Sequence, residues 1–227
     1  MRIEMHIHTS NVSPCARVPA PEAARIHAKA GMDAVVVTEH FNDYVLESFP
    51  GSPREKVDRY LDGYRAVQEE GARLGLTVIL GMESRILGGS EDFLIYGIDP
   101  DFLYANPTFY HYTQKEAFDA CCEYGALLLQ AHPFRTGCHP RDPKLLHGIE
   151  IYNGHPRHDN NNDQAEAWAN EHGLRLRTSG SDFHQVQDCG TGGILIDGTV
   201  SNSKELASWL LNKPFTLIKG KATAPSL

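Results

Sequence analysis

Asp182 and His184 are the pair whose residue types and spacing most clearly suggest chemistry. The preceding run, 174–178, alternates apolar and polar residues as a half-buried strand does, and Gly180 then allows a sharp turn. Residues two apart in an extended segment point to the same side. The spacing therefore predicts a carboxylate and an imidazole presented together beyond a strand end, as metal ligands would be.

Metal-ligand residue types also follow other apolar runs of strand length: His6, His8, Glu39, His40, Glu83 and His132. His6 and His8 form an H-x-H pair, and strand alternation places both imidazoles close enough to bind one ion. Taken together, the set holds more nitrogen and oxygen ligands than one ion can use. We therefore expect two or three divalent metal ions. Imidazole and carboxylate ligands suit zinc, manganese or iron, and the sequence does not choose among them.

Each of these residues also has a structural interpretation. Glu83 could be neutralised by an arginine such as Arg85, since an unpaired buried charge is costly. His40 and His132 could be hydrogen-bonded core histidines. The combination of ligand types at several strand ends favours the metal site over these separate explanations.

The composition bounds the class of protein. The 227 residues, 41% hydrophobic and 22% charged, suffice for one sizeable core. A net charge of −8 argues against a strong nucleic-acid surface, although bound metal ions could still attract a small anionic substrate. We recognise no membrane span or signal peptide, and the five cysteines lack C-x-x-C spacing. We expect one cytoplasmic domain, 1–227, with a flexible tail at 220–227. The oligomeric state stays open.

Strands and helices alternate along the chain. Apolar runs predict strands at 2–6, 33–37, 76–80, 93–96, 126–129, 148–152, 174–178, 192–196 and 215–218. Helical spacing and capping residues predict helices at 21–30, 53–67, 113–124, 162–172 and 202–210. This alternation is typical of α/β proteins with a parallel sheet. Ligands at five or more strand ends favour a closed barrel over an open doubly wound sheet, because a ring brings all strand ends around one centre.

Five motifs resemble those of the PHP family (polymerase and histidinol phosphatase). They are Met5-His6-Ile7-His8-Thr9-Ser10, Thr38-Glu39-His40, Gly81-Met82-Glu83, Ala131-His132-Pro133 and Gly180-Ser181-Asp182-Phe183-His184. They occur in the family's order over nearly the full chain, and the segment 150–154 resembles a further family segment.

The resemblance implies a distorted seven-stranded TIM-like α/β barrel, (β/α)7, with a trinuclear site that hydrolyses phosphate esters. Carried over by motif, His6, His8 and Asp182 would hold one metal. Glu83 would bridge it to a second metal, which His132 also binds. His40 and His184 would hold the third. Cys15 stands in the loop where family members often carry an Asp or His ligand. Asp92 or His111 could replace a histidine that often opens the strand after the glutamate.

The catalytic residues expected from this arrangement are Glu83, Asp182, His184 and Arg135. A metal-activated hydroxide would attack phosphorus in line. Arg135 is the first choice for gripping the phosphate, because guanidinium matches phosphate bidentately. Arg17 and Arg157 are second choices, and any of the three could be an ordinary surface arginine. His184 or His155 could protonate the leaving oxygen.

The favoured function is a metal-dependent phosphoesterase acting on a small phosphorylated metabolite or a nucleotide end. One alternative is an amidohydrolase-like enzyme that cleaves a C–N bond, although such sites usually contain a bridging lysine and none of the five motifs has one. The other is a non-catalytic metal-binding PHP module, against which the near-complete ligand set counts.

Overall fold

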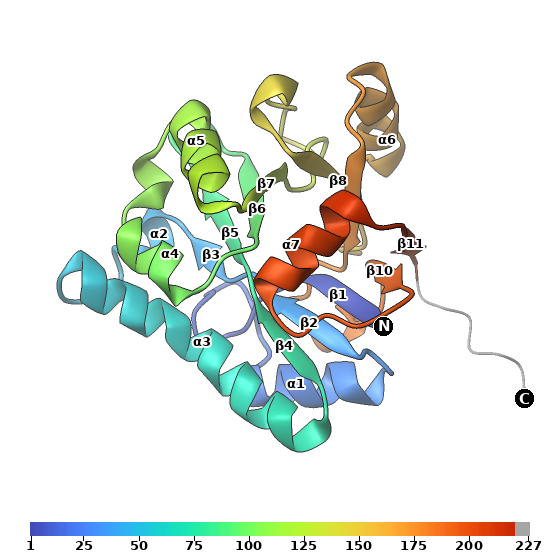
Figure 1. Cartoon of the computed structure of the whole chain (residues 1–227). Helices are drawn as coiled ribbons and strands as arrows, with labels where there is room; N and C mark the ends of the chain where they lie inside the picture. The colour runs from blue at the N-terminus through green and yellow to red at the C-terminus, as the bar shows by residue number, and fades with distance from the viewer. Residues whose placement is uncertain (221–227) are drawn as a thin grey trace, which may run out of the picture.

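The computed structural model describes residues 1–220 and is a mixed α/β fold (Figure 1). The strands are β1 (Arg2–Ile7), β2 (Ala34–Val37), β3 (His40–Phe41), β4 (Thr77–Leu80), β5 (Met82–Arg85), β6 (Asp92–Tyr96), β7 (Leu127–Gln130), β8 (Gly148–Asn153), β9 (Leu176–Gly180), β10 (Gly192–Ile196) and β11 (Phe215–Lys219). The α-helices are α1 (Ala20–Lys29), α2 (Asp43–Leu46), α3 (Pro53–Leu74), α4 (Pro100–Ala105), α5 (Gln114–Tyr124), α6 (Asn162–Glu171) and α7 (Ser203–Asn212). Apart from Gly220, the expected tail at 220–227 lies outside the described residues.

The strands form two sheets. One has the order β11-β10-β1-β2-β4 and the other β3-β5-β6-β7-β8-β9. They are continuous through the chain, since β2 leads into β3 and β4 leads into β5. Within residues 1–220, β1 and β9 form no ladder, and a single isolated bridge joins Ile7 of β1 to Phe183, which lies beyond the end of β9. The α/β class with parallel pairing is thus confirmed, whereas the closed seven-stranded barrel is not.

Strand direction departs from the expected parallel arrangement. β6 pairs antiparallel with both β5 and β7, and β10 pairs antiparallel with β1 and β11. The chain between β5 and β6 covers only residues 86–91, and a parallel crossover needs about a dozen residues or more. One consequence matters for the site. The first residue of β6, Asp92, lies opposite the last residue of β5, Arg85, at the edge where the neighbouring parallel strands end.

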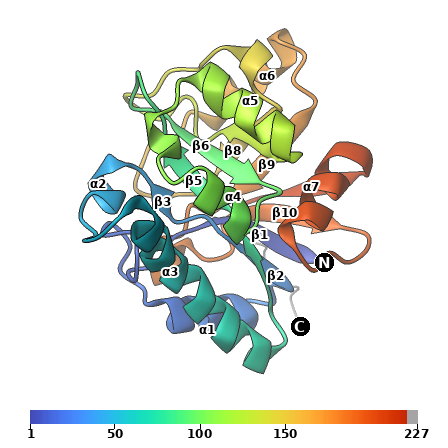
Figure 2. The same ribbon diagram turned by 60° about the vertical axis from the view of Figure 1, so that its left-hand side comes forward.

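A shared core joins the two sheets. Met5 of β1 and Ile79 of β4 belong to the same buried cluster as Leu94 of β6 and Leu129 of β7. Helices α1 and α3 pack side by side and cover β2 and β4 through a second cluster (Figures 1 and 2). This packing fixes the strand ends relative to one another, although the assignment of 1–227 to one domain stays a prediction.

Helix ends follow the capping signals in the sequence. Ser52 and Glu55 form a capping box at the start of α3, with Pro53 at its first position, and Gly75 ends the helix at a φ of 70°. Thr113 and Glu116 cap α5 in the same way. Within residues 1–220, no helix combines the length and the apolar character needed to cross a lipid bilayer.

His27 should make the fold sensitive to acid. Its side chain in α1 is fully buried, Nδ1 lies 2.8 Å from the Ala23 carbonyl oxygen, and the ring packs against Phe183. Burial lowers the pKa of His27 to about 4. The unfolded chain takes up a proton near pH 6.5, so this residue's contribution to stability falls as the pH drops from about 6.5 towards 4.

We expect His27→Gln to remove this dependence. The free energy of unfolding of the wild type, relative to the variant, should fall by about 2 kcal/mol between pH 7 and pH 5. Urea denaturation of both proteins at the two pH values measures it. Parallel pH profiles would contradict the assignment.

Candidate metal centre

The predicted ligands converge at one edge of the strands. β1 ends just before His8, β3 begins at His40, and β5 carries Glu83. His132 and Asp182 each lie two residues beyond a strand, β7 and β9 respectively. The pairing of β3 with β5 sets His40 directly opposite Glu83. Residues far apart in the sequence therefore meet in one buried cluster, as the motif spacing predicts.

Glu83 lies at the centre of this cluster, and its side chain is 1% exposed. Its carboxylate contacts four imidazoles. Oε1 is 3.2 Å from Nε2 of both His6 and His132. Oε2 is 3.3 Å from Nε2 of His8 and 2.7 Å from Nδ1 of His40. A carboxylate with two oxygens facing different nitrogen pairs has the geometry of a bridging ligand.

Asp182 supplies a second carboxylate to the same space. Its Oδ1 lies 3.5 Å from Nε2 of His6, 3.4 Å from Nε2 of His8 and 3.3 Å from Nδ1 of His184. Its Oδ2 accepts a hydrogen bond from Nη2 of Arg135. Asp182 thus joins the imidazole cluster to the half-buried guanidinium of Arg135.

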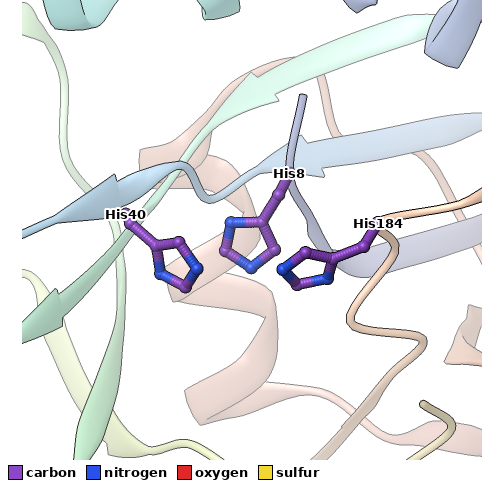
Figure 3. Close-up of side chains that lie close together, drawn as sticks. All are labelled: His8, His40 and His184. Carbon is purple, nitrogen blue, oxygen red and sulfur yellow. The ribbon is translucent and has the colours of Figure 1, made fainter. Parts of the chain in front are cut away.

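A further set of imidazoles lies beside these carboxylates. Figure 3 shows His8 between His40 and His184, with the three rings facing a common space. The ring centroid of His8 lies 4.1 Å from that of His40 and 4.5 Å from that of His184. One nitrogen from each lies within 4.8 Å of the others. Similar groups are formed by His6, His8 and Glu83 and by Glu83, Asp92 and His132.

Several buried polar atoms here are left without a hydrogen bond within residues 1–220. They include Oε2 of Glu83 and Nδ1 of His40, which lie 2.7 Å apart without forming a well-directed hydrogen bond, and Nδ1 of His132. Buried polar groups are ordinarily satisfied, and a bound ion would satisfy those that are not. Because these atoms belong to metal-ligand residue types and face one another, the donor set fits bound cations.

The electrostatics of the cluster favour positive charge. Burial would raise the pKa of Glu83, but nearby His6 and His40 hold it well below its usual range. Burial likewise opposes a charged His6, yet Asp182, Glu83 and Glu150 raise its pKa well above the ordinary value. The carboxylates thus favour a proton on His6 and on His40, whereas burial and the neighbouring histidines lower the pKa of His8. Metal ions would take the place of those protons, since histidine binds metal as the neutral imidazole.

Backbone strain occurs at two of the predicted ligands. His132 has a φ of 27° and Asp182 a φ of 52°, in the left-handed region that few non-glycine residues adopt. Such conformations persist where the surrounding structure enforces them, and they cluster at functional sites. Next to Asp182, Gly180 leaves room for β1, because a Cβ atom there would lie 2.5 Å from Cβ of His6.

The additional ligand candidates have different outcomes. Asp92 is 5% exposed and groups with Glu83 and His132, but it is also the partner of Arg85, at 2.8 and 3.0 Å. Arg85 therefore pairs with Asp92, and the alternative in which it neutralises Glu83 is not observed. The Cys15 thiol lies 3.2 Å from Nε2 of His184.

His111 is not brought to the cluster. It is an exposed residue of the short 3-10 helix Phe109–His111, and its Nε2 lies 3.1 Å from Oδ1 of exposed Asp43. The sequence placed it in a loop near the strand after Glu83, but a loop position does not determine the direction of a side chain.

The arginine candidates are also separated by the structure. Arg135 lies at the centre, donating to Asp182, to Asn153 at 3.1 Å and to Asn160 at 2.8 Å. Arg157 instead forms two hydrogen bonds to Asp188, at 2.6 and 2.7 Å. Arg17 has an exposed side chain. The first choice for the phosphate-binding arginine is thus the one nearest the ligands.

Sequence reasoning assigned no role to Glu150, a buried residue of β8 that supports the ligands. Its Oε1 lies 3.0 Å from Nδ1 of His6, while its Oε2 accepts hydrogen bonds from the backbone NH of His132 at 3.0 Å and from Asn153 at 2.9 Å. A carboxylate that accepts the other N–H of a histidine ligand fixes its ring orientation. The sequence feature that could have indicated this role is a charged residue, Glu150, within the otherwise apolar strand β8.

We expect Glu150→Gln to weaken metal binding about 10- to 100-fold, the usual effect of removing such a supporting carboxylate. Calorimetric titration of metal-free protein with Zn²⁺ measures it. Glu69→Gln, on the exposed face of α3, is the control and should leave the affinity unchanged. Equal affinities for wild type and Glu150→Gln would show that Glu150 does not orient His6.

An open pocket of about 300 Å³ leads to the cluster, and its walls include Glu83, His132, Arg135, Asp182 and His184. A neighbouring pocket of about 680 Å³ is lined by residues of the 152–164 segment. His155 and His158 line both. The centre is therefore accessible to a small molecule, with a larger polar space beside it.

The solved structures that resemble the chain include a Bacteroides protein, a Pseudomonas protein and endonuclease Q. A two-domain protein from Bacteroides vulgatus, described as containing a predicted PHP-like metal-dependent phosphoesterase, aligns with a TM-score of 0.68 and 19% identity over 97% of this chain and 65% of its own. PsfC from Pseudomonas syringae aligns with a TM-score of 0.66 and 18% identity over 96% of this chain and 91% of its own. Endonuclease Q, in complex with a 27-mer duplex substrate with an abasic lesion at the active site, aligns with a TM-score of 0.61 and 13% identity. The alignment covers 95% of this chain and 57% of that protein.

The chain shares the fold of PHP-like metal-dependent phosphoesterases. The structural comparison thus supports the resemblance to PHP proteins that the five motifs indicated. No protein-family model and no curated protein sequence matches the chain. The chain spans 65% of the length of the Bacteroides protein, and identities below 20% relate folds rather than substrates.

Proposed function

We propose that this PHP-like chain is a metal-dependent phosphoesterase that hydrolyses a small phosphorylated metabolite or a nucleotide end. The observation that carries the proposal is the buried Glu83 carboxylate in contact with four imidazoles beside Asp182. A cytoplasmic location remains part of the proposal.

The site would hold two or three divalent ions of zinc, manganese or iron. His6, His8 and Asp182 would form one position, and Glu83 would bridge it to a second that includes His132. His40 and His184 would contribute to a third. When bound, such ions activate water for attack and neutralise charge that develops on a phosphoryl group.

Arg135 would hold the phosphate. Asp182, Asn153 and Asn160 fix its guanidinium through Nη2 and Nε, and Nη1 has no hydrogen-bond partner among residues 1–220. The side chain lines the pocket, so Nη1 can reach a bound molecule. A guanidinium fixed on one side and free on the other would orient a phosphate without moving itself.

The proton for the leaving oxygen is better supplied by His184 than by His155. Burial lowers the pKa of His155 to about 4, and its Nε2 lies 2.8 Å from an Arg157 nitrogen, which can only donate. His155 is therefore a poor candidate for the proton donor. His184 lies at the pocket, where burial opposes but Asp182 raises its pKa. His184 would serve as the acid only in a centre whose third metal position is empty.

A phosphate-release screen tests the proposal. Metal-reconstituted protein would be assayed with p-nitrophenyl phosphate, phosphorylated metabolites, nucleotides and a short duplex with an abasic site, beside a panel of cyclic amides. Hydrolysis of phosphate esters supports the proposal. Cleavage of amides alone would replace it with the C–N hydrolase, which is disfavoured because none of the described residues that line the pocket is a lysine. Metal binding without any hydrolysis would indicate a non-catalytic module.

A further inference from the structure

The loop that carries Cys15 is held against the histidines. Ser13 Oγ donates to Glu39 Oε2 at 2.6 Å and accepts the backbone NH of His40 at 3.1 Å. Two residues beyond the cysteine, the backbone NH of Arg17 donates to the carbonyl oxygen of His184 at 2.9 Å. The loop is thus anchored on both sides of Cys15, once to each histidine-bearing segment. The thiol position is set by these anchors.

The thiol faces the end of the cluster formed by His40 and His184, whose Nδ1 atoms contact Glu83 and Asp182 respectively. Its Sγ lies 3.2 Å from Nε2 of His184, and it also interacts with His40. His8 Nε2 is close to His6, Glu83 and Asp182, at 3.0 to 3.4 Å. His40 and His184 therefore need another ligand if they are to bind an ion of their own.

We propose that the Cys15 thiolate binds a metal ion together with His40 and His184. This inference rests on the proposed metal centre and concerns its third position. Two nitrogens and one sulfur leave a coordination position open, as catalytic zinc sites with three protein ligands do. Because Cys15 is exposed, that position would face the pocket that the thiol helps to line.

A thiolate ligand changes which ion this position prefers. Soft thiolate ligands favour zinc, whereas carboxylate and water favour manganese and magnesium. Bound zinc at this position should therefore resist exchange by excess Mn²⁺. The Asp182 and Glu83 positions, which have carboxylate ligands, should exchange more readily.

Cobalt substitution tests the thiolate directly. Metal-free protein would be titrated with Co²⁺, and absorption in the near ultraviolet would be followed for thiolate-to-cobalt charge transfer. The wild type should show this band and Cys15→Ser should lose it. Cys138→Ser is the matched control, because Cys138 interacts with His132 at the other end of the cluster. Cys122→Ser removes a distant exposed thiol next to His147.

The outcomes separate this inference from the proposed function. A band that persists in Cys15→Ser, or that disappears in Cys138→Ser instead, overturns the Cys15 assignment. Zinc X-ray absorption gives a second readout, with a sulfur neighbour at about 2.3 Å in the wild type and none in Cys15→Ser. Metal-dependent phosphate release without any sulfur ligand would refute the inference and leave the phosphoesterase standing. Failure to bind any metal would refute both.

Discussion

Glu83→Gln is expected to lower the rate of phosphate-ester hydrolysis by about 10³-fold or more. Glutamine matches glutamate in size but removes the charge that the four surrounding imidazoles share. Metal ions contribute several kcal/mol of charge stabilisation in such reactions, and each 1.36 kcal/mol corresponds to a tenfold change in rate. Loss of the bridging carboxylate should remove most of that contribution. Initial rates with p-nitrophenyl phosphate and metal content per chain measure the effect.

Glu70→Gln is the matched control for this substitution. Glu70 is 7% exposed and pairs with Arg25 and Arg73 at 2.8 and 3.0 Å, in α3 rather than in the centre. It should retain full metal content and activity. A Glu83→Gln protein that still bound its metals and hydrolysed substrate at a tenth of the wild-type rate would exclude a bridging role for Glu83.

The second large effect is expected for Asp182→Asn, which should lower the hydrolysis rate by about 10²-fold or more and reduce bound metal. Asparagine tolerates the left-handed conformation that Asp182 adopts, so the backbone should be preserved. The substitution removes the charge that faces His6, His8 and His184. It also leaves the Arg135 guanidinium without its carboxylate partner. Elemental analysis and initial rates measure the two consequences.

Asp99→Asn provides the comparison for Asp182→Asn. Asp99 caps α4 and pairs with Lys204 at the surface, and asparagine caps helices about as well as aspartate. This variant should be fully active. Were Asp182→Asn equally active with unchanged metal, Asp182 would be a structural residue and the assignment by motif would be wrong.

The sequence was most informative where a polar residue follows an apolar strand. The sequence assigns four ligand-type residues to strand ends because each follows an apolar run of strand length: His6, Glu83, His132 and Asp182. The structure brings all four together. Capping boxes at α3 and α5 were equally clear, since their hydrogen bonds are local. Local chemistry is therefore predictable from residue types and spacing.

Long-range features were less accessible. The antiparallel direction of β6 cannot be inferred from its apolar residues, because hydrophobic spacing is the same in either direction. Glu150 supports two ligands from another strand, a contact that depends on the register between β8 and its neighbours. Closure of a barrel would need pairing between β1 and β9, whereas within residues 1–220 the isolated bridge from β1 reaches only Phe183, beyond the end of β9. Such properties belong to the assembled sheets rather than to any one segment.

The metal content of protein purified without chelator tests the central claim most directly. Elemental analysis should find two or three equivalents of zinc, manganese or iron per chain in the wild type, and fewer in Glu83→Gln. Protein that retains no metal, and takes up none when Zn²⁺, Mn²⁺ or Fe²⁺ is supplied, would contradict the account.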